Sequence, residues 1–211
     1  MTSLDKLLSI GSPSIGSTDL EDNVFAEIPE WCSPIRGLLK RRNGFYAFES
    51  ALHVLPVGTP AHTIDCIRWN RPDLWKACYG ADLTDVFMFA EDAFGRQFGL
   101  KPSGVIHFEP ETGIAAGLAS DLDEWAASLL ADHRWLTGWP LAHEWQSQNG
   151  RLADGERLVP VIPFIAGGEY AVSNLHALRA EVGMQLRCEF YQQTKDLRPG
   201  DKVKIMIKES D

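Results

Sequence analysis

The sequence is poor in cysteine and has none of the short cysteine patterns that bind zinc or exchange thiols. Its four cysteines, Cys32, Cys66, Cys78 and Cys188, are far apart, and no CxxC pair occurs. Zinc-finger and thioredoxin-like motifs are therefore excluded. Because free cysteine behaves as a small buried hydrophobe, we expect four reduced, buried thiols.

Long apolar runs are also missing from the sequence. Residues 1–10 hold no apolar stretch of signal-peptide length, and no run approaches the roughly 20 apolar residues that cross a bilayer. We therefore expect a cytoplasmic protein that does not bind membranes.

Catalytic and phosphate-binding motifs are absent too. The chain has no GxSxG nucleophile elbow. Its nearest approach to a glycine-rich loop, residues 165–168, lacks the spacing that directs several backbone N–H groups at an anion. We therefore predict a protein that is not an enzyme, with no catalytic residue, cofactor or metal ion.

What the sequence does contain is apolar and aromatic material in amounts typical of a packed globule. Hydrophobic residues make up 45% of the 211 positions, and seven of them are tryptophans. A chain of this length can bury a sizeable core, and we expect one compact domain with additions.

Negative charge is concentrated in one stretch of the chain. The formal net charge is −9, and residues 82–132 hold ten acids against two bases, Arg96 and Lys101. Such a stretch would repel nucleic acid and attract a basic partner. The alternative is that these carboxylates are scattered around a solvated rim.

A β-meander followed by a helix is the clearest structural pattern. Short apolar or alternating segments are separated by turn residues at 86–90, 96–100, 104–109 and 114–118. Ser120 then caps a helix with an apolar stripe from Leu122 to Leu130, and an earlier helix starts at Ser33. We predict an α+β fold with a mostly antiparallel central sheet flanked by helices.

The ends of the chain differ from this central pattern. Residues 11–18, GSPSIGST, cannot hold a helix and predict a flexible segment over residues 1–18. Residues 19–134 form the predicted core domain. Residues 135–211 form a predicted C-terminal α/β extension, which starts irregularly and continues with an edge strand at 158–165, a helix at 184–194 and a last strand at 203–207.

One group of polar residues within the meander has the chemistry of metal ligands. The group is Glu91, Asp92, His107, Glu109 and Glu111, and His107 and Glu109 share one face of a strand. One histidine with scattered carboxylates lacks the spacing of a zinc site, however. A metal-dependent hydrolase that uses Glu91, Asp92, His107 and Glu109 is therefore the less favoured alternative.

Three blocks of the sequence resemble the central part of proteins of the SUKH (Smi/Knr-like) superfamily. They are residues 75–80, 86–98 with the Phe94-Gly95 turn, and 105–113, VIHFEPETG. The resemblance covers residues 28–130 and leaves the chain after Trp135 outside it. It implies an α+β binding scaffold in which Phe94, Gly95 and Gly113 are fold determinants.

In bacteria the resemblance also implies a function. It indicates an immunity protein encoded beside a polymorphic toxin that is delivered by contact-dependent or type VI secretion. The expected partner is a basic protein toxin, such as a nuclease or another nucleotide-directed effector. The alternatives are a regulatory scaffold that binds an endogenous protein and a structural subunit of a larger complex.

The acidic stretch suggests how such a protein would neutralise its toxin. Carboxylates that mimic a polyanionic substrate would cover a basic cleft of the toxin and raise the association rate. The predicted contact residues are Asp82, Asp85, Glu91, Asp92, Glu109 and Glu111.

Overall fold

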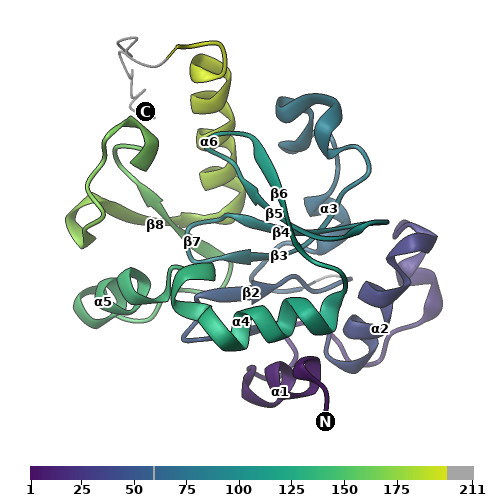
Figure 1. Ribbon diagram of the computed structural model, residues 1–211. Helices are drawn as coiled ribbons and strands as arrows, with labels where there is room; N and C mark the ends of the chain where they lie inside the picture. The colour runs from purple at the N-terminus through teal and green to yellow at the C-terminus, as the bar shows by residue number, and fades with distance from the viewer. Residues whose placement is uncertain (59, 199–211) are drawn as a thin grey trace.

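The computed structural model describes residues 1–58 and 60–198, and a six-stranded antiparallel sheet forms its centre (Figure 1). The strands follow one another in chain order: β1 (Phe45–Ala47), β2 (Leu52–Val54), β3 (Phe87–Asp92), β4 (Gln97–Lys101), β5 (Gly104–Glu109) and β6 (Ile114–Ala119). The predicted α+β fold with an antiparallel meander is confirmed. The strand predicted at 203–207 lies outside the described residues.

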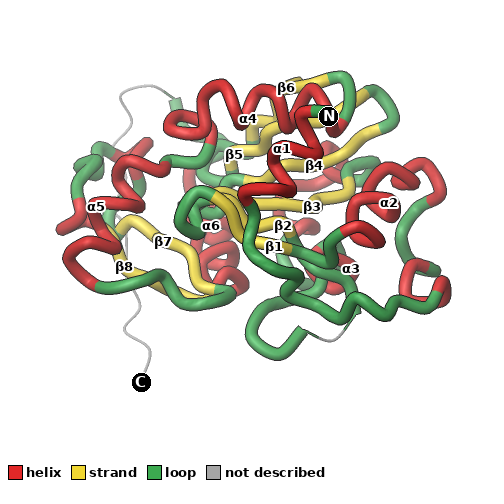
Figure 2. The backbone as a smooth tube through the Cα atoms, turned by 90° about the horizontal axis from the view of Figure 1, so that it is seen from below, coloured by secondary structure: helices red, strands yellow, loops and turns green. Residues whose placement is uncertain are grey.

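One face of the sheet is covered by α4 (Leu122–Leu136), on which α1 (Ser3–Ile10) packs in turn (Figure 2). The cap of α4 is Asp121, not the Ser120 that the sequence suggested: the Asp121 side chain accepts hydrogen bonds from the N–H groups of Asp123 and Glu124 in the first turn. The Trp125 ring of α4 contacts Phe89 and Phe98 of the sheet. The apolar stripe of α4 thus forms one half of the main core.

The other face carries α3 (Cys66–Trp69) and the 3₁₀ segment η3 (Lys76–Leu83). The helix α2 (Ser33–Arg41) lies beside the sheet (Figure 1), and the 3₁₀ segments η1 (Asp22–Phe25) and η2 (Glu30–Cys32) precede it in the chain. Phe108 of β5 packs against Trp75 and Tyr79 on this side. Both faces of the sheet are therefore buried, which explains why β3 is buried along its whole length.

The N-terminal segment differs from the prediction of a flexible stretch over residues 1–18. Thr2 and Asp5 form a reciprocal capping box at the start of α1. Leu7 and Leu8 are buried in the main core. A capped turn and two buried leucines stabilise this short helix, and the Gly/Ser/Pro stretch begins only after it.

The C-terminal extension contains α5 (Trp139–Asn149), β7 (Glu156–Pro160), β8 (Leu175–Arg179) and α6 (Ala180–Thr194), with η4 (Phe164–Ala166) and η5 (Val172–Asn174) between the strands. β7 and β8 form a separate antiparallel pair beside the central sheet (Figure 1). The irregular start predicted for the extension is wrong, because Pro140 begins a helix there. Phe94 and Leu158 belong to a second core cluster between the sheet and the extension.

The cysteines correct a further expectation. Cys78 of η3 and Cys188 of α6 form a disulfide, whereas Cys32 and Cys66 are free and buried. Only two of the four cysteines are therefore the reduced thiols that we expected. The two bonded cysteines are 110 residues apart in the sequence, so no local pattern indicates that they meet. The packing of α6 brings them together. Within residues 1–58 and 60–198, no helix has the length and apolar character needed to cross a bilayer.

Candidate functional site

A cleft of about 630 Å³ lies where the β3–β4 and β5–β6 turns meet the C-terminal end of α4 and the extension. Its charged lining residues are Arg96, Glu109, Glu111, Asp132, Arg134 and Arg187. Its apolar lining residues are Phe94, Trp135, Pro140, Phe164, Ile165 and Tyr170. A predominantly apolar concave surface with a few converging charges is typical of a binding site.

Three large apolar side chains of the cleft are exposed to solvent. Trp135 is 74% exposed, Tyr170 61% and Ile165 52%. All three belong to residues 135–211: Trp135 lies at the end of α4, Ile165 in η4 and Tyr170 in the loop after it. Exposed Trp and Tyr side chains that surround one cleft are typical of sites where a protein partner docks.

Phe94 forms the aromatic floor of this cleft. Its ring centroid lies 5.8 Å from that of Phe164 and 6.0 Å from that of Tyr170. Gly138, at φ +66°, allows the chain to pass against Phe94, because a Cβ at this position would lie 2.2 Å from the ring. The Phe-Gly turn that the sequence marked as a fold determinant thus also supports the cleft.

Two glutamates provide the acidic part of the cleft. Glu109 accepts a hydrogen bond from the backbone N–H of Glu111 at 3.2 Å, and burial raises the pKa of Glu109 to about 7. Glu111 accepts one from the N–H of Ile165 at 3.3 Å, and burial raises its pKa as well. Among the described residues, no cation forms an ion pair with either carboxylate.

Two arginines of the cleft are held by acceptors within the protein. Arg96 donates from Nε to Asp92 at 2.5 Å and from Nη2 to the carbonyl of Trp135 at 3.2 Å. Arg187 donates from Nη1 to the carbonyl of Gly183 at 3.0 Å and from Nη2 to the carbonyls of Phe94 and Leu158. These hydrogen bonds fix the two guanidinium groups in the cleft walls and link the segments that form them.

Glu91 and Asp92 lie beneath this surface, and the prediction that they contact a partner is wrong. Glu91 is 1% exposed and accepts hydrogen bonds from Arg157 and His53, both at 2.9 Å. Burial alone would raise the pKa of Glu91, but Arg157 and His53 lower it to about 2. Asp92 is 0% exposed and binds the N–H groups of the Phe94-Gly95 turn and Arg96. Both carboxylates are saturated inside the fold.

The remaining predicted residues are divided between the cleft and other places. Glu109 and Glu111 line the cleft, and Asp85 is exposed outside its lining. The side chain of Asp82 lies outside the described part of the structure. His107 stacks on Phe98 with centroids 5.2 Å apart and does not line the cleft. In the part of the chain that the structure describes, no three His, Cys, Asp or Glu side chains could hold a metal ion.

Most of the cleft is formed by residues that the sequence did not indicate as a site. Arg134, Trp135, Ile165, Tyr170 and Arg187 come from segments that the family resemblance does not cover. Trp135 is one of the seven tryptophans that the sequence shows, but nothing in the local pattern marks it as exposed. The proximity of these residues depends on how the extension folds back, which no local pattern indicates.

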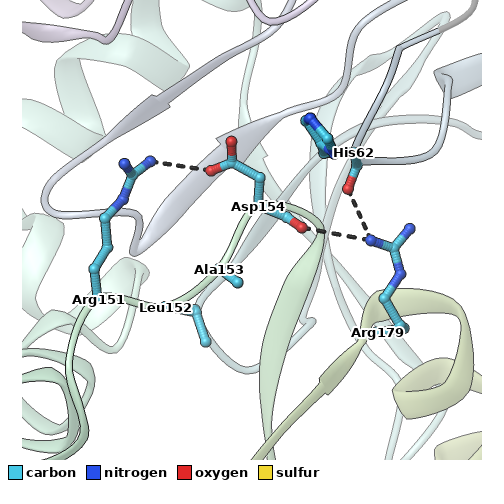
Figure 3. A pocket seen from close by; sticks show the side chains of 6 residues that line it. All are labelled: His62, Arg151, Leu152, Ala153, Asp154 and Arg179. Atoms are coloured by element: carbon cyan, nitrogen blue, oxygen red, sulfur yellow. Dashed lines mark hydrogen bonds and ion pairs between the residues drawn. The ribbon is translucent and has the colours of Figure 1, made fainter.

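A second, shallower depression of about 370 Å³ lies on the extension and is shown in Figure 3. Arg151 donates to the carboxylate of Asp154 at 3.0 Å. Arg179 donates to the carbonyls of His62 at 2.8 Å and Asp154 at 3.4 Å. Since both guanidinium groups already serve acceptors of the protein, these contacts fasten the loop before β7 to the core.

Comparison with known proteins gives a fold relationship. No protein-family model matches the sequence, and no curated protein matches it either. Among solved structures, the chain is similar to the crystal structure of Atu4351 from Agrobacterium tumefaciens, with a TM-score of 0.52, 12% sequence identity and 86% of each chain covered. At this identity the likeness concerns the fold alone. Because 86% of the chain is covered, the shared fold includes part of the C-terminal extension.

Proposed function

We propose that this chain is an immunity protein that binds a cognate bacterial toxin and blocks its active site. The exposed apolar mouth of the cleft, formed by Trp135, Ile165 and Tyr170, is the observation that carries the binding role. The resemblance of residues 28–130 to SUKH proteins supports the immunity role, and we place the protein in the cytoplasm, where such a toxin acts.

The proposed mode of binding differs from the acidic face that the sequence suggested. Aromatic side chains that become buried at the centre of an interface supply most of its affinity, while charges at its rim mainly affect the association rate. We therefore assign the affinity to Trp135 and Tyr170. The exposed carboxylates of Asp121, Asp123 and Glu124 at the start of α4 would attract a basic toxin from a distance.

Co-expression with the product of the adjacent gene tests this function. We expect the chain to rescue the growth of cells that produce the toxin and to purify together with it. The substitutions Trp135→Ala and Tyr170→Ala should each weaken the complex by about 2 kcal/mol or more, roughly thirtyfold in Kd. Isothermal titration calorimetry with the purified partner measures this change.

A matched control separates the cleft from exposed apolar surface in general. Ile10 is 52% exposed at the end of α1, and Ile10→Ala should leave the affinity unchanged. If the adjacent gene product neither binds nor harms cells, the immunity proposal fails. If Trp135→Ala, Tyr170→Ala and Ile10→Ala bind equally well, the cleft is not the docking site.

The same cleft supports a second candidate, a regulatory scaffold that binds an endogenous protein. A cleft with exposed Trp135 and Tyr170 suits any protein partner of complementary shape. The gene neighbourhood distinguishes the two candidates. Rescue of growth from the neighbouring gene product supports immunity, whereas capture of a housekeeping protein without such rescue supports the scaffold.

A further inference from the structure

The cleft contains carboxylate oxygens whose capacity to accept hydrogen bonds is largely unused. An ionised carboxylate offers about four acceptor sites. Glu109 uses one of them for the N–H of Glu111, and Glu111 uses one for the N–H of Ile165. Glu109 is half-buried, burial raises its pKa, and no described cation forms an ion pair with it, so a cationic donor that arrives with a partner would be stabilised there.

The arginines around these glutamates meet this demand only in part: Arg96 acts to lower the pKa of Glu109 and Arg187 that of Glu111, but burial outweighs both and leaves the two pKa values raised. Arg96 is paired with Asp92, and Arg187 donates to three backbone carbonyls. Arg134 lies over the ring of Trp139, 5.1 Å from its centroid. By contrast, Glu91 in the layer beneath has a full ion pair with Arg157. Among the described residues of this part of the sheet, Glu109 is thus a half-buried acid that has no ion pair and can accept a cation from outside.

The walls of the cleft suit a planar cation. Trp135 and Tyr170 present exposed aromatic rings at its mouth, on which a guanidinium group can stack. A guanidinium also forms two parallel hydrogen bonds with one carboxylate, which an ammonium group cannot do. The volume of about 630 Å³ is large enough for one arginine with its neighbouring residues.

We infer that the cleft accepts an arginine side chain of the docking protein, with its guanidinium paired to Glu109 and its aliphatic stem between Trp135 and Tyr170. This inference rests on the proposed function, because it takes the cleft to be a protein-docking site. It adds the chemistry of the anchoring residue, which the exposed aromatic mouth alone does not specify.

Pairing with a cation couples binding to the protonation of Glu109. Burial raises the pKa of Glu109 to about 7. Below this pH the Glu109 carboxyl group is mostly protonated, and a cation can pair with it only after the proton has left. The charged groups that face Glu109 from the neighbouring elements are Arg96, Asp92 and Glu111, with Asp132, Arg134 and Arg187 elsewhere in the lining. The affinity for an arginine should therefore rise about tenfold between pH 6 and pH 8.

Short peptides test the inference without the toxin. We would titrate the full chain with the blocked tripeptide Ala-Arg-Ala and with its citrulline analogue, which has the same shape but no charge. We expect the arginine peptide to bind at least tenfold more tightly at pH 8, measured by calorimetry and by the change in total tryptophan fluorescence. Glu109→Gln should remove both this preference and the pH dependence.

Two further variants make the result specific. Glu49→Gln changes an exposed acid outside the cleft and should leave peptide binding unchanged. Glu111→Gln should weaken binding less than Glu109→Gln does, since Arg187 already stabilises the charge of Glu111. Equal affinity for the arginine and citrulline peptides, or full binding by Glu109→Gln, would overturn the arginine site. Toxin binding in co-expression would still stand in that case, so the two proposals fail separately.

Discussion

At the scale of single residues, two acids of the central sheet, Glu91 of β3 and Glu109 of β5, have opposite roles. Glu91 is neutralised inside the fold by Arg157, a residue of the extension 66 positions away. Glu109, on the neighbouring hairpin, has no ion pair with a described cation, and the nearby Arg96 is paired with Asp92. The difference follows from which arginine the fold brings near, and it separates a carboxylate that stabilises the protein from one available to a partner.

Glu91→Gln should lower the free energy of unfolding by about 3–5 kcal/mol, because it leaves the buried Arg157 guanidinium without its counter-charge. Urea denaturation followed by tryptophan fluorescence measures this loss. The exposed pair of Glu49 and His143 provides the control, and Glu49→Gln should change stability by less than about 0.5 kcal/mol. Similar small effects for both variants would show that the Glu91–Arg157 pair contributes little.

Glu109→Gln should act in the opposite direction. The pKa of Glu109 is raised from 4.5 to about 7, so the folded protein binds more protons than the unfolded chain between these values. The free energy of unfolding of the wild type therefore falls as the pH rises from 4.5 to 7. At pH 8 the variant should be more stable by about 1–3 kcal/mol.

Denaturation at pH 8 and pH 5 checks this sign, because the advantage of the variant should disappear at pH 5, where Glu109 is protonated. A variant that is less stable at pH 8 would contradict the assignment of Glu109 as a half-buried acid without an ion pair. Gain of stability together with loss of peptide binding is the behaviour expected of a functional residue.

At the scale of elements, the sequence predicted what local periodicity and capping determine. The meander of β3 to β6 and the helix α4 have alternating or helical patterns bounded by turn residues, and both are present, although the cap of α4 is Asp121 and not the neighbouring Ser120. The helix α1 was missed because its eight residues are stabilised by burial of Leu7 against the core, which is a tertiary effect. The cleft was missed for the same reason, since half its lining comes from the extension.

The disulfide between η3 and α6 is an element-scale constraint that the sequence did not indicate. Tyr79, next to Cys78, donates to the carbonyl of Pro110 in the turn that carries Glu109 and Glu111. Replacing both Cys78 and Cys188 by Ser should lower the free energy of unfolding by about 2–4 kcal/mol, because the bond closes a long loop.

A reducing agent provides the control for this prediction. It should destabilise the wild type to the same extent and leave the double variant unchanged, since Cys32 and Cys66 are free thiols in both. Denaturation curves recorded with and without dithiothreitol measure the two effects. A wild type that is indifferent to reduction would show that the packing of α6 alone holds η3 in place.

At the scale of the whole molecule, the core and the extension are joined by buried polar contacts. The side chain of Arg157 enters the core to meet Glu91, and Tyr46 of β1 accepts a hydrogen bond from the N–H of Gly155. The N–H of Leu158 donates to the carbonyl of Ala93 at 2.8 Å. The boundary near residue 134 that the family resemblance suggested therefore does not separate independent parts, because each of these contacts would leave a buried polar group unpaired if broken.

A chain truncated after residue 134 should fail to fold. It would lose the Arg157 charge that neutralises Glu91 and would expose Phe94 of the second core cluster. We expect no dispersed amide spectrum and no cooperative urea transition from residues 1–134, and recovery of both when residues 135–211 are co-expressed as a separate chain. The intact protein should unfold in one step, with coincident fluorescence and circular dichroism curves. A folded 1–134 fragment would instead show that the extension is an addition to a self-sufficient core, and the cleft would then lie between two separable units.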